Sequence, residues 1–304
     1  MEHTPNNGQR HDAPASAPVH EEFERSFDVR GKAPEIDILP GVLRIMEEIA
    51  AFALQGLPSL DDLSVRSKRD AADLVSNRDY AMEAKVIELV HRTFPRHVVI
   101  SEEIGTVGNE HSEHQWLVDP IDGSCNDSHA IPWSCVSVAY VTSGEIWAGL
   151  IVNPHTGEVF QAVRGQGATL NSRRILVSNA QSLAGAVVMT ELLNQSPWQG
   201  MAGFMDALAS QDATVRIMGS TALSSSQVAA GRVAAVALAD AGLLDVAAGV
   251  LIAEEAGAVI LQDGHPAHGL PHGRLLIAAP GVTLAMKQTL SGVDARGEKG
   301  VEKH

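Results

Sequence analysis

The chain has 304 residues, and its 37 acidic and 22 basic side chains give a formal net charge of −15 at neutral pH. A content of 45% hydrophobic and 19% charged residues is typical of a globular protein and argues against a wholly disordered chain. The acidic balance argues against a general nucleic-acid or acidic-membrane binder, because such binding needs clustered lysine and arginine to neutralise phosphate.

Both ends of the chain are polar. Residues 1–34 predict a disordered tail and residues 292–304 a second polar tail, since neither has apolar periodicity. No basic region precedes an apolar one as in a signal peptide, and no apolar run reaches the roughly 18 residues that span a bilayer. Only two cysteines occur, Cys125 and Cys135, and we expect reduced thiols. These features predict a cytoplasmic protein without a membrane partner.

Two helices are predicted at the start of the first folded half, residues 35–180. Apolar residues recur at helical spacing over Ile36–Leu54, and a basic, polar connection follows. Ser76 and Asp79 then fit the capping pattern that opens a second helix. The apolar stripe of this helix is expected to include Tyr80, Ala84, Ile87 and Val90.

Strands follow the two helices. His97–Ser101 and Trp116–Val118 are short apolar runs typical of buried strands. From Trp133 to about Leu170 the pattern alternates with period two between turns, which predicts an antiparallel meander.

In the second half, residues 181–291, strand-like and helical stretches alternate. The last clear helix is expected over 246–256, with Asp245 at its N-cap and Gly257 just past its end. Two closing strands follow this helix. The pattern indicates α+β structure in the first half and α/β structure in the second, sharing one core.

The strongest signal for chemistry is the run Trp116–Asn126 (WLVDPIDGSCN), in which a buried strand meets two carboxylates. Pro120 cannot donate to a strand ladder, so the strand must end there, and side chains at such an end face the crevice where ligands bind. Asp119 and Asp122 repel each other unless a cation lies between them or one is protonated. A hard divalent cation such as Mg²⁺ fits this pair.

Gly123 and Ser124 follow the two carboxylates directly. Glycine allows close backbone approach, and the two exposed amides could hold an anion. The alternative interpretation is purely structural, with Asp119 as a turn residue before proline and Asp122 as a helix cap. Considered singly, Glu102 at the end of a strand and Asp245 at the start of a helix are also explained by a solvated edge and an N-cap.

Taken together, the order E…DPIDGS…D resembles the inositol monophosphatase family of Mg²⁺-dependent, lithium-sensitive sugar phosphatases. The resemblance covers about residues 36–290. It extends to flanking stretches, namely Asp73–Ser76, Phe94-Pro95, Ser101–Glu103, Pro132-Trp133, Val136–Val138, Gly165–Ala168, Asn171, Gly219-Ser220 and Glu255–Gly257. It implies a layered αβαβα sandwich and a homodimer.

The resemblance also implies a metal site. One Mg²⁺ would be held by Glu102, Asp119 and the backbone carbonyl of Ile121. A second would be held by Asp119, Asp122 and Asp245. Asp79 matches a carboxylate near the catalytic hydroxyl and a weakly held third ion, so two or three ions are expected.

The resemblance further assigns catalytic and phosphate-binding roles. Glu102 with Ser124 would orient and deprotonate the attacking water, with Asp79 nearby. The amides of Gly123 and Ser124 would receive the phosphate, and Asp122 and Asp245 would face the substrate as well. Two metals clamp the attacking and leaving oxygens in such a reaction and acidify the bound water.

These residues predict a Mg²⁺-dependent phosphomonoesterase that hydrolyses inositol 1-phosphate or a related polyol or sugar phosphate. Two alternatives are a superfamily phosphatase for another substrate (a nucleotide 3′-phosphate, fructose 1,6-bisphosphate, histidinol phosphate or an aminocyclitol phosphate) and a regulatory binding protein that retains the fold. No nucleic-acid partner is expected. Lys68 lies in the connection that corresponds to a flap over the site.

Departures from the family pattern put selectivity for inositol in doubt. Leu244 replaces an aromatic residue, and Asp127 follows Asn126 where Phe or Tyr is usual. Leu238 falls where the family has an inositol-contacting Glu, and Asp240 could substitute only if the loop shifts.

Other candidate sites are weaker. We expect a turn, not a zinc site, at His265, His268 and His272, because their segment is rich in Gly and Pro. Gly165 and Gly167 also predict a turn, and no base in the sequence pairs with Cys125.

Overall fold

The computed structural model describes residues 38–68, 74–193, 195–240 and 242–299, which belong to one compact unit, Pro34–His304. The tail predicted for residues 1–34 lies outside the described residues. None of the helices that are described is both long and apolar enough to cross a membrane.

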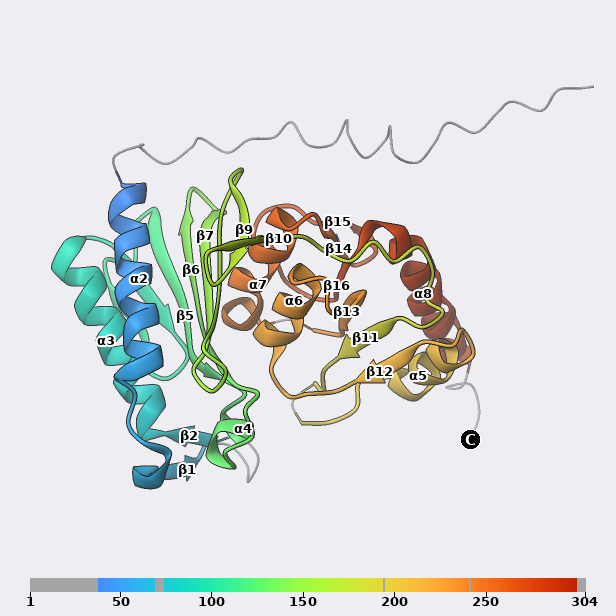
Figure 1. The fold of residues 1–304 in the computed structure, drawn as a ribbon, viewed down its shortest axis with the longest axis horizontal. Coiled ribbons are helices and arrows are strands. Elements are labelled where there is room, and N and C mark those ends of the chain that lie inside the picture. Colours follow the sequence, from blue (N-terminus) through green and yellow to red (C-terminus); the bar gives the residue numbers. More distant parts are fainter. Residues whose placement is uncertain (1–37, 69–73, 194, 241, 300–304) are drawn as a thin grey trace, which may run out of the picture. The chain divides into compact units, whose positions relative to one another are not determined.

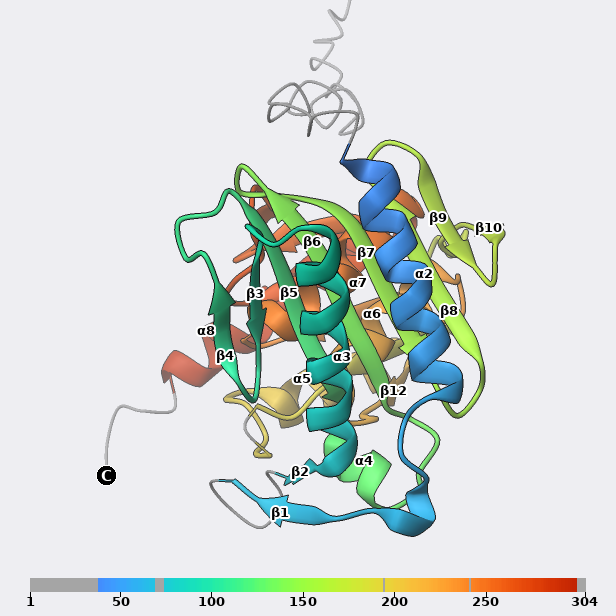
Figure 2. The same ribbon diagram turned by 90° about the vertical axis from the view of Figure 1, so that its left-hand side faces the viewer.

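Two helices, α2 (Leu39–Gln55) and α3 (Asn77–Thr93), pack together on one face of the first sheet (Figures 1 and 2). The predicted capping box opens α3: Ser76 Oγ accepts from the Arg78 amide at 3.1 Å, and Asp79 Oδ2 accepts from the Ser76 amide at 2.8 Å. Before α3 lies a short 3₁₀ turn, η1 (Leu60–Asp62), and the expected irregular connection instead includes an antiparallel pair, β1 (Val65–Ser67) and β2 (Leu74–Ser76).

The apolar stripe predicted for α3 is wrong in part. Tyr80 is 45% exposed and Ala84 is also exposed, whereas Val90 is buried as expected. The buried face is instead formed by side chains spaced four, seven and eight residues from the first, namely Met82, Val86, Leu89 and Val90. Tyr80 lies two residues before Met82, which places it on the opposite side of the helix.

The first sheet has eight strands in the order β10-β9-β8-β7-β6-β5-β3-β4. β5 is parallel to β3 and antiparallel to β6, and the meander predicted between Trp133 and Leu170 is confirmed in β6, β7 and β8. The strands are β3 (Val98–Ser101), β4 (Gly105–Gly108), β5 (His114–Asp122), β6 (Cys135–Thr142), β7 (Glu145–Asn153), β8 (Glu158–Val163), β9 (Gly167–Leu170) and β10 (Arg173–Ile175).

The second sheet has six strands in the order β12-β11-β13-β16-β14-β15. β11 is parallel to both β12 and β13, while β16 is antiparallel to β13 and β14. The strands are β11 (Val187–Thr190), β12 (Thr214–Arg216), β13 (Ala235–Leu238), β14 (Val259–Gln262), β15 (His265–Pro266) and β16 (Leu275–Ala278).

Helices α6 (Thr221–Ala229) and α7 (Leu243–Glu255) lie between the two sheets, as Figure 1 shows. All residues of α7 from Val246 to Ala253 are buried, because the helix contacts strands of both sheets. Helices α5 (Met201–Ala209) and α8 (Thr283–Lys299) cover the outer face of the second sheet. The layered αβαβα sandwich is therefore confirmed.

Three boundaries differ from the sequence analysis. β5 does not end at Pro120 but continues to Asp122, because pairing with β6 is only interrupted at the proline and resumes between Asp122 and Cys135. The N-cap of α7 is Gly242, so Asp245 lies within the first turn of the helix and is not its cap. The stretch from residue 292 onward is not a tail throughout, because α8 follows a short 3₁₀ turn, η2 (Pro280–Val282), and continues to Lys299. Helix-forming residues such as Ala, Arg, Glu and Lys follow Gly292, and each of the two glycines in this helix, Gly292 and Gly297, costs only about 1 kcal/mol.

Candidate active site

The end of β5 positions the two carboxylates of the DPIDGS run. Asp119 is 3% exposed, and its Oδ1 accepts a hydrogen bond from the Ile121 amide at 3.1 Å. Asp119 pairs with Ser137 and Asp122 with Cys135, and the register between strands β5 and β6 shifts between these pairs. This irregularity follows from Pro120, which has no amide hydrogen to donate. The Ile121 side chain is buried in the core.

Asp122 is held by the start of α6. Its Oδ2 accepts hydrogen bonds from Ser220 Oγ at 2.6 Å and from the Ala222 amide at 2.7 Å. Both donors use the same oxygen, which leaves Oδ1 for another partner. Sequence reasoning missed this role of Ser220, because its contact with Asp122 spans 98 residues.

The structure brings together the carboxylates that the sequence analysis singled out. Asp119 lies at the end of β5, and its pKa is raised well above the usual value by burial. Neighbouring negative charges raise it further, and they belong to Asp122, Glu102, Asp245 and Asp79. Five carboxylates from the ends of β3 and β5 and the first turns of α3 and α7 therefore form one acidic group, which we call the carboxylate cluster.

Burial is also the largest cause of the raised pKa values of Asp122, Asp245 and Asp79. It raises the pKa of Asp122 to about 6, although hydrogen bonds from Ser220 and the α6 backbone oppose the shift. It raises the pKa of Asp245 to about 7, with the charges of Asp122 and Glu102 adding to the effect. It raises the pKa of Asp79 to about 6 against the hydrogen bonds from Ser76. Without added positive charge, these aspartates therefore favour their protonated forms.

Lys68 supplies one positive charge to the cluster. Its ammonium group bonds to Glu102 Oε1 at 2.9 Å and also pairs with Glu103. Burial alone would lower the pKa of Lys68, but the hydrogen bonds to Glu103 and Glu102 outweigh it and raise the pKa. The same charge lowers the pKa values of Asp79 and Asp245, so Lys68 acts on several members at once.

Two buried glutamates support the site and were missed by sequence reasoning. Glu83 Oε1 accepts from the Glu103 amide at 2.8 Å and from Ser101 Oγ, which fixes the turn that carries Glu102. Glu191 accepts from the Gly219 amide at 2.7 Å and from Ser224 Oγ at 2.6 Å, and burial raises its pKa to about 7. Glu191 directly follows the buried strand β11, the same signal that pointed to Glu102.

Gly123 and Ser124 lie immediately beside the cluster. Gly123 has φ +88° in the left-handed region and precedes α4 (Ser124–Ser128), whose first residue is Ser124. A Cβ atom at Gly123 would lie 2.9 Å from the Trp133 carbonyl oxygen and 3.0 Å from that of Gly219. Only glycine fits between these carbonyls, and Gly123 and Ser124 are both partly exposed.

Gly123→Ala is therefore expected to lower the melting temperature and to remove activity, because it adds a steric clash to the strain of a left-handed residue, roughly 1–2 kcal/mol. The matched control is Gly144→Ala, where φ is +76° but no heavy atom lies within 4 Å of the added Cβ. The control should show the strain alone and keep its activity. Phosphate release measures the activity of the two variants, and thermal denaturation measures their melting temperatures. Equal activity in the two variants would contradict this assignment.

The donor set fits a hard cation in kind, since all its members are carboxylate oxygens. Across the described ranges, no three His, Cys, Asp or Glu side chains stand close enough to hold a metal as they lie. The clustered carboxylates would thus have to move closer together around an ion. The charge of that ion would offset the repulsion that, together with burial, raises the pKa values of Asp119, Asp122 and Asp245.

Other predicted residues lie as follows. Leu238 ends β13 and is 3% exposed, Leu244 packs against the core, and Asp240 is exposed. His265, His268 and His272 lie on or after β15, and they form no metal group in the described part of the chain. Cys125 is a partly exposed free thiol.

Gly165 and Gly167 form the turn that was expected of them. Their amides each donate to the Glu255 carboxylate at 2.7 Å, which ties the β8–β9 turn to the end of α7.

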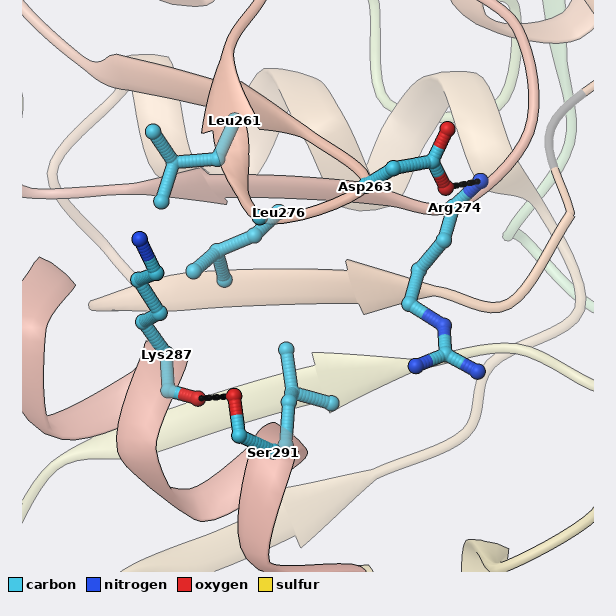
Figure 3. Close-up of a pocket in the computed structure, with 8 residues that line it drawn as sticks. Leu261, Asp263, Arg274, Leu276, Lys287 and Ser291 are labelled. Atoms are coloured by element: carbon cyan, nitrogen blue, oxygen red, sulfur yellow. Dashed lines mark hydrogen bonds between the residues drawn. The ribbon is translucent and has the colours of Figure 1, made fainter. Parts of the chain in front are cut away.

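Two surface hollows lie apart from the carboxylate cluster. One of about 180 Å³ lies between β14, β16 and α8, where Leu261 and Leu276 face Lys287 (Figure 3). A wider one of about 640 Å³ is lined by residues that include Arg173, Arg174 and Arg232. No member of the carboxylate cluster lines either hollow, so neither is the candidate site.

Comparisons with known proteins identify the family to which this chain is similar. The model of the inositol monophosphatase family matches residues 42–292. Nus factor SuhB of Pasteurella multocida is 36% identical over 240 residues, which cover 78% of this chain and 90% of that protein. Inositol-1-monophosphatase of Caulobacter vibrioides is 34% identical over 246 residues, covering 77% of this chain and 94% of that protein. The solved inositol monophosphatase of Anabaena (Nostoc) sp. PCC 7120 superposes with a TM-score of 0.71 at 30% identity, covering 84% and 96% of the two chains.

Proposed function

The chain belongs to the inositol monophosphatase family, and from this premise we propose that it is a Mg²⁺-dependent phosphomonoesterase acting on a small polyol or sugar phosphate, with inositol 1-phosphate as the first candidate. One observation supports the proposal: the charges of Glu102, Asp122 and Asp245 all act on buried Asp119, which lies four residues before Gly123. Carboxylates for cations and amides for phosphate are the two requirements of metal-assisted phosphoryl transfer.

In this proposal the carboxylates hold two ions. Glu102, Asp119 and the Ile121 carbonyl would hold one, and Asp119, Asp122 and Asp245 the other, with Asp79 near a third. Bound Mg²⁺ lowers the pKa of a coordinated water and offsets the charge of the phosphoryl group.

In this proposal, residues of the chain transfer the proton and position the water and the phosphate. Glu102, at the end of β3, accepts the proton of the attacking water, and the Ser124 hydroxyl orients that water. The amides of Gly123 and Ser124 hold the phosphate oxygens, and the rigid Gly123 turn keeps them in place. Asp122 Oδ2 accepts hydrogen bonds at the start of α6, so Oδ1 would be the oxygen available to hold a metal.

The direct test is release of inorganic phosphate from inositol 1-phosphate with and without Mg²⁺. A panel of other monoesters should accompany it: a nucleotide 3′-phosphate, fructose 1,6-bisphosphate, histidinol phosphate and an aminocyclitol phosphate. We expect metal-dependent hydrolysis of at least one polyol or sugar phosphate. Absence of metal-dependent hydrolysis across the whole panel would refute the proposed enzyme.

The substrate within this class depends on the leaving-group side of the site. Leu238, which falls where the family has an inositol-contacting glutamate, is buried at the end of β13 and offers no charge. This substitution favours a related polyol or sugar phosphate over strict selectivity for inositol, and the panel separates these possibilities.

A second candidate function is a regulatory binding role. The relative from Pasteurella multocida is named a Nus factor and not a phosphatase. A binding partner that is retained by both the wild type and Asp122→Asn in a pull-down would support this role independently of catalysis.

Membership in the family also leads us to propose a cytoplasmic homodimer. Light scattering after size-exclusion chromatography would test whether the protein is a dimer.

A further inference from the structure

A buried polar cluster lies directly after the DPIDGSCN run, and the proposed chemistry does not use it. Its centre is Asp127, which is 1% exposed. Asp127 Oδ1 accepts from Ser134 Oγ at 3.0 Å and lies 3.1 Å from His155 Nε2, while Oδ2 lies 2.9 Å from Arg78 Nε. We call Arg78, Asp127, Ser134 and His155 the Asp127 cluster.

The members of the Asp127 cluster adjoin the site on several sides. Arg78 lies in the first turn of α3, next to Asp79, and its Nη1 donates to the Pro58 carbonyl at 2.6 Å. Asp127 belongs to α4, and its amide donates to the Gly123 carbonyl at 3.0 Å.

Ser134 and His155 anchor the other side of the cluster. Ser134 precedes Cys135, whose strand partner is Asp122. His155 lies between β7 and β8, and its amide donates to Asn153 Oδ1 at 2.9 Å. The cluster therefore connects the start of α3, the α4 turn and the β6 edge of the site.

Asp127 is charged in this environment. Burial alone would raise its pKa, but the hydrogen bond to His155, the charge of Arg78 and the hydrogen bond from Ser134 outweigh burial and lower it. A buried ion pair is costly to desolvate, and an apolar pair of similar size is often as stable. An aromatic residue is usual at this position in the family that the sequence resembles. Arg78 Nε and Asp127 Oδ2 lie 2.9 Å apart without forming a hydrogen bond, so the pair adds a short-range attraction between opposite charges that an apolar contact lacks.

We propose that the Arg78–Asp127 pair positions the Gly123–Ser124 turn against Asp79. Neither residue touches the reacting atoms. Arg78 is fixed to Pro58 and to the first turn of α3, and Asp127 is fixed to α4, so their contact sets how far apart these two parts of the site lie. The inference rests on the proposed phosphatase function and adds two positioning residues to it.

The kinetic test compares variants at a temperature at which circular dichroism shows them all to be folded. Asp127→Asn keeps the size of the side chain and removes its charge, and Arg78→Met removes the other charge. We expect kcat to fall by roughly 10²-fold in each, as for a catalytic turn that is displaced, with KM within about threefold of the wild type. Arg78→Lys retains the charge and should recover most of kcat.

The matched control is Glu158→Gln. It also removes the carboxylate partner of an arginine, since Glu158 Oε1 lies 2.5 Å from Arg232 Nη2. This pair contacts none of the site residues in the described part of the chain, and kcat should equal that of the wild type.

A second readout does not depend on activity. Cys125 is a partly exposed thiol in α4, two residues before Asp127, whereas Cys135 is fully buried. If Asp127 holds α4 in place, alkylation of Cys125 by iodoacetamide should be roughly tenfold faster in Asp127→Asn, while Cys135 stays protected. Mass spectrometry of peptides distinguishes the two cysteines.

The outcomes separate the two proposals. Unchanged kcat and unchanged Cys125 alkylation in Asp127→Asn and Arg78→Met would overturn the positioning role. Faster Cys125 alkylation in a protein whose wild type hydrolyses no monoester would support the positioning role and reject the phosphatase. If the single variants do not fold, Arg78→Met/Asp127→Leu removes both charges together. Wild-type kcat and alkylation in that folded double variant would likewise overturn the inference.

Discussion

Asp122→Asn is expected to reduce phosphate release by roughly 10³-fold or more while leaving the protein folded. The reason lies in how the two carboxylate oxygens are used. Oδ2 accepts from Ser220 and from the Ala222 amide, and a single amide oxygen can accept both bonds in its place. The amide nitrogen then occupies the position of Oδ1, where it presents hydrogens to a cation.

The expected stability of Asp122→Asn sharpens this test. Replacing one carboxylate removes a charge that raises the pKa values of Asp119 and Asp245. The metal-free variant should therefore melt at or above the temperature of the metal-free wild type. The matched control is Asp206→Asn on the exposed surface of α5, which should retain full activity. A well-folded Asp122→Asn variant with near-normal turnover would refute the role assigned to Asp122.

Removal of Mg²⁺ is the second change with a large expected effect. A chelator should abolish hydrolysis, and Mg²⁺ at about 100 times its dissociation constant should stabilise the fold by about 2.7 kcal/mol. For a chain of this size that corresponds to a rise in melting temperature of roughly 5 °C or more. Calorimetry with and without Mg²⁺ measures both the stabilisation and the rise in melting temperature.

The size of this stabilisation should depend on pH. Folding raises the pKa of Asp122 to about 6 and that of Asp245 to about 7, against about 3.9 for an unfolded aspartate. The folded, metal-free protein thus binds protons more tightly than the unfolded chain, and these groups make its free energy of unfolding fall as pH rises from about 4 to 7. A metal ion must displace those protons at low pH.

Mg²⁺ should accordingly raise the melting temperature much more at pH 8 than at pH 5. Asp122→Asn provides the control, since its response to Mg²⁺ should be weak at both pH values. An equal rise at pH 5 and pH 8 in the wild type would show that the carboxylate cluster is not where the ion binds.

The layered fold and the grouping of the carboxylates could be predicted because their signals are local. Pro120 interrupts the pairing near the end of β5, and that strand carries both Asp119 and Asp122 to its carboxyl end. The resemblance then linked these residues to Glu102 and Asp245, which lie far away in sequence.

The supporting contacts could not be predicted in the same way. Glu191 holds the Gly219 turn, and Asp127 meets Arg78 and His155, through contacts between segments separated by tens of residues. No periodicity in the sequence specifies such partners. The exposed Tyr80 shows the same limit, since an aromatic side chain at helical spacing predicts a core residue, whereas tertiary packing leaves Tyr80 on the surface.

The contacts of Asp122 have a consequence for how the protein is made. The donors that fix its Oδ2 lie 98 and 100 residues further along the chain, and Asp245 comes later still. A nascent chain that has emerged only as far as the first sheet has Asp119 and Asp122 but neither α6 nor α7 to hold the site together. Phosphatase activity should thus appear only after most of the chain has left the ribosome, which makes activity a sensitive reporter of complete synthesis and assembly.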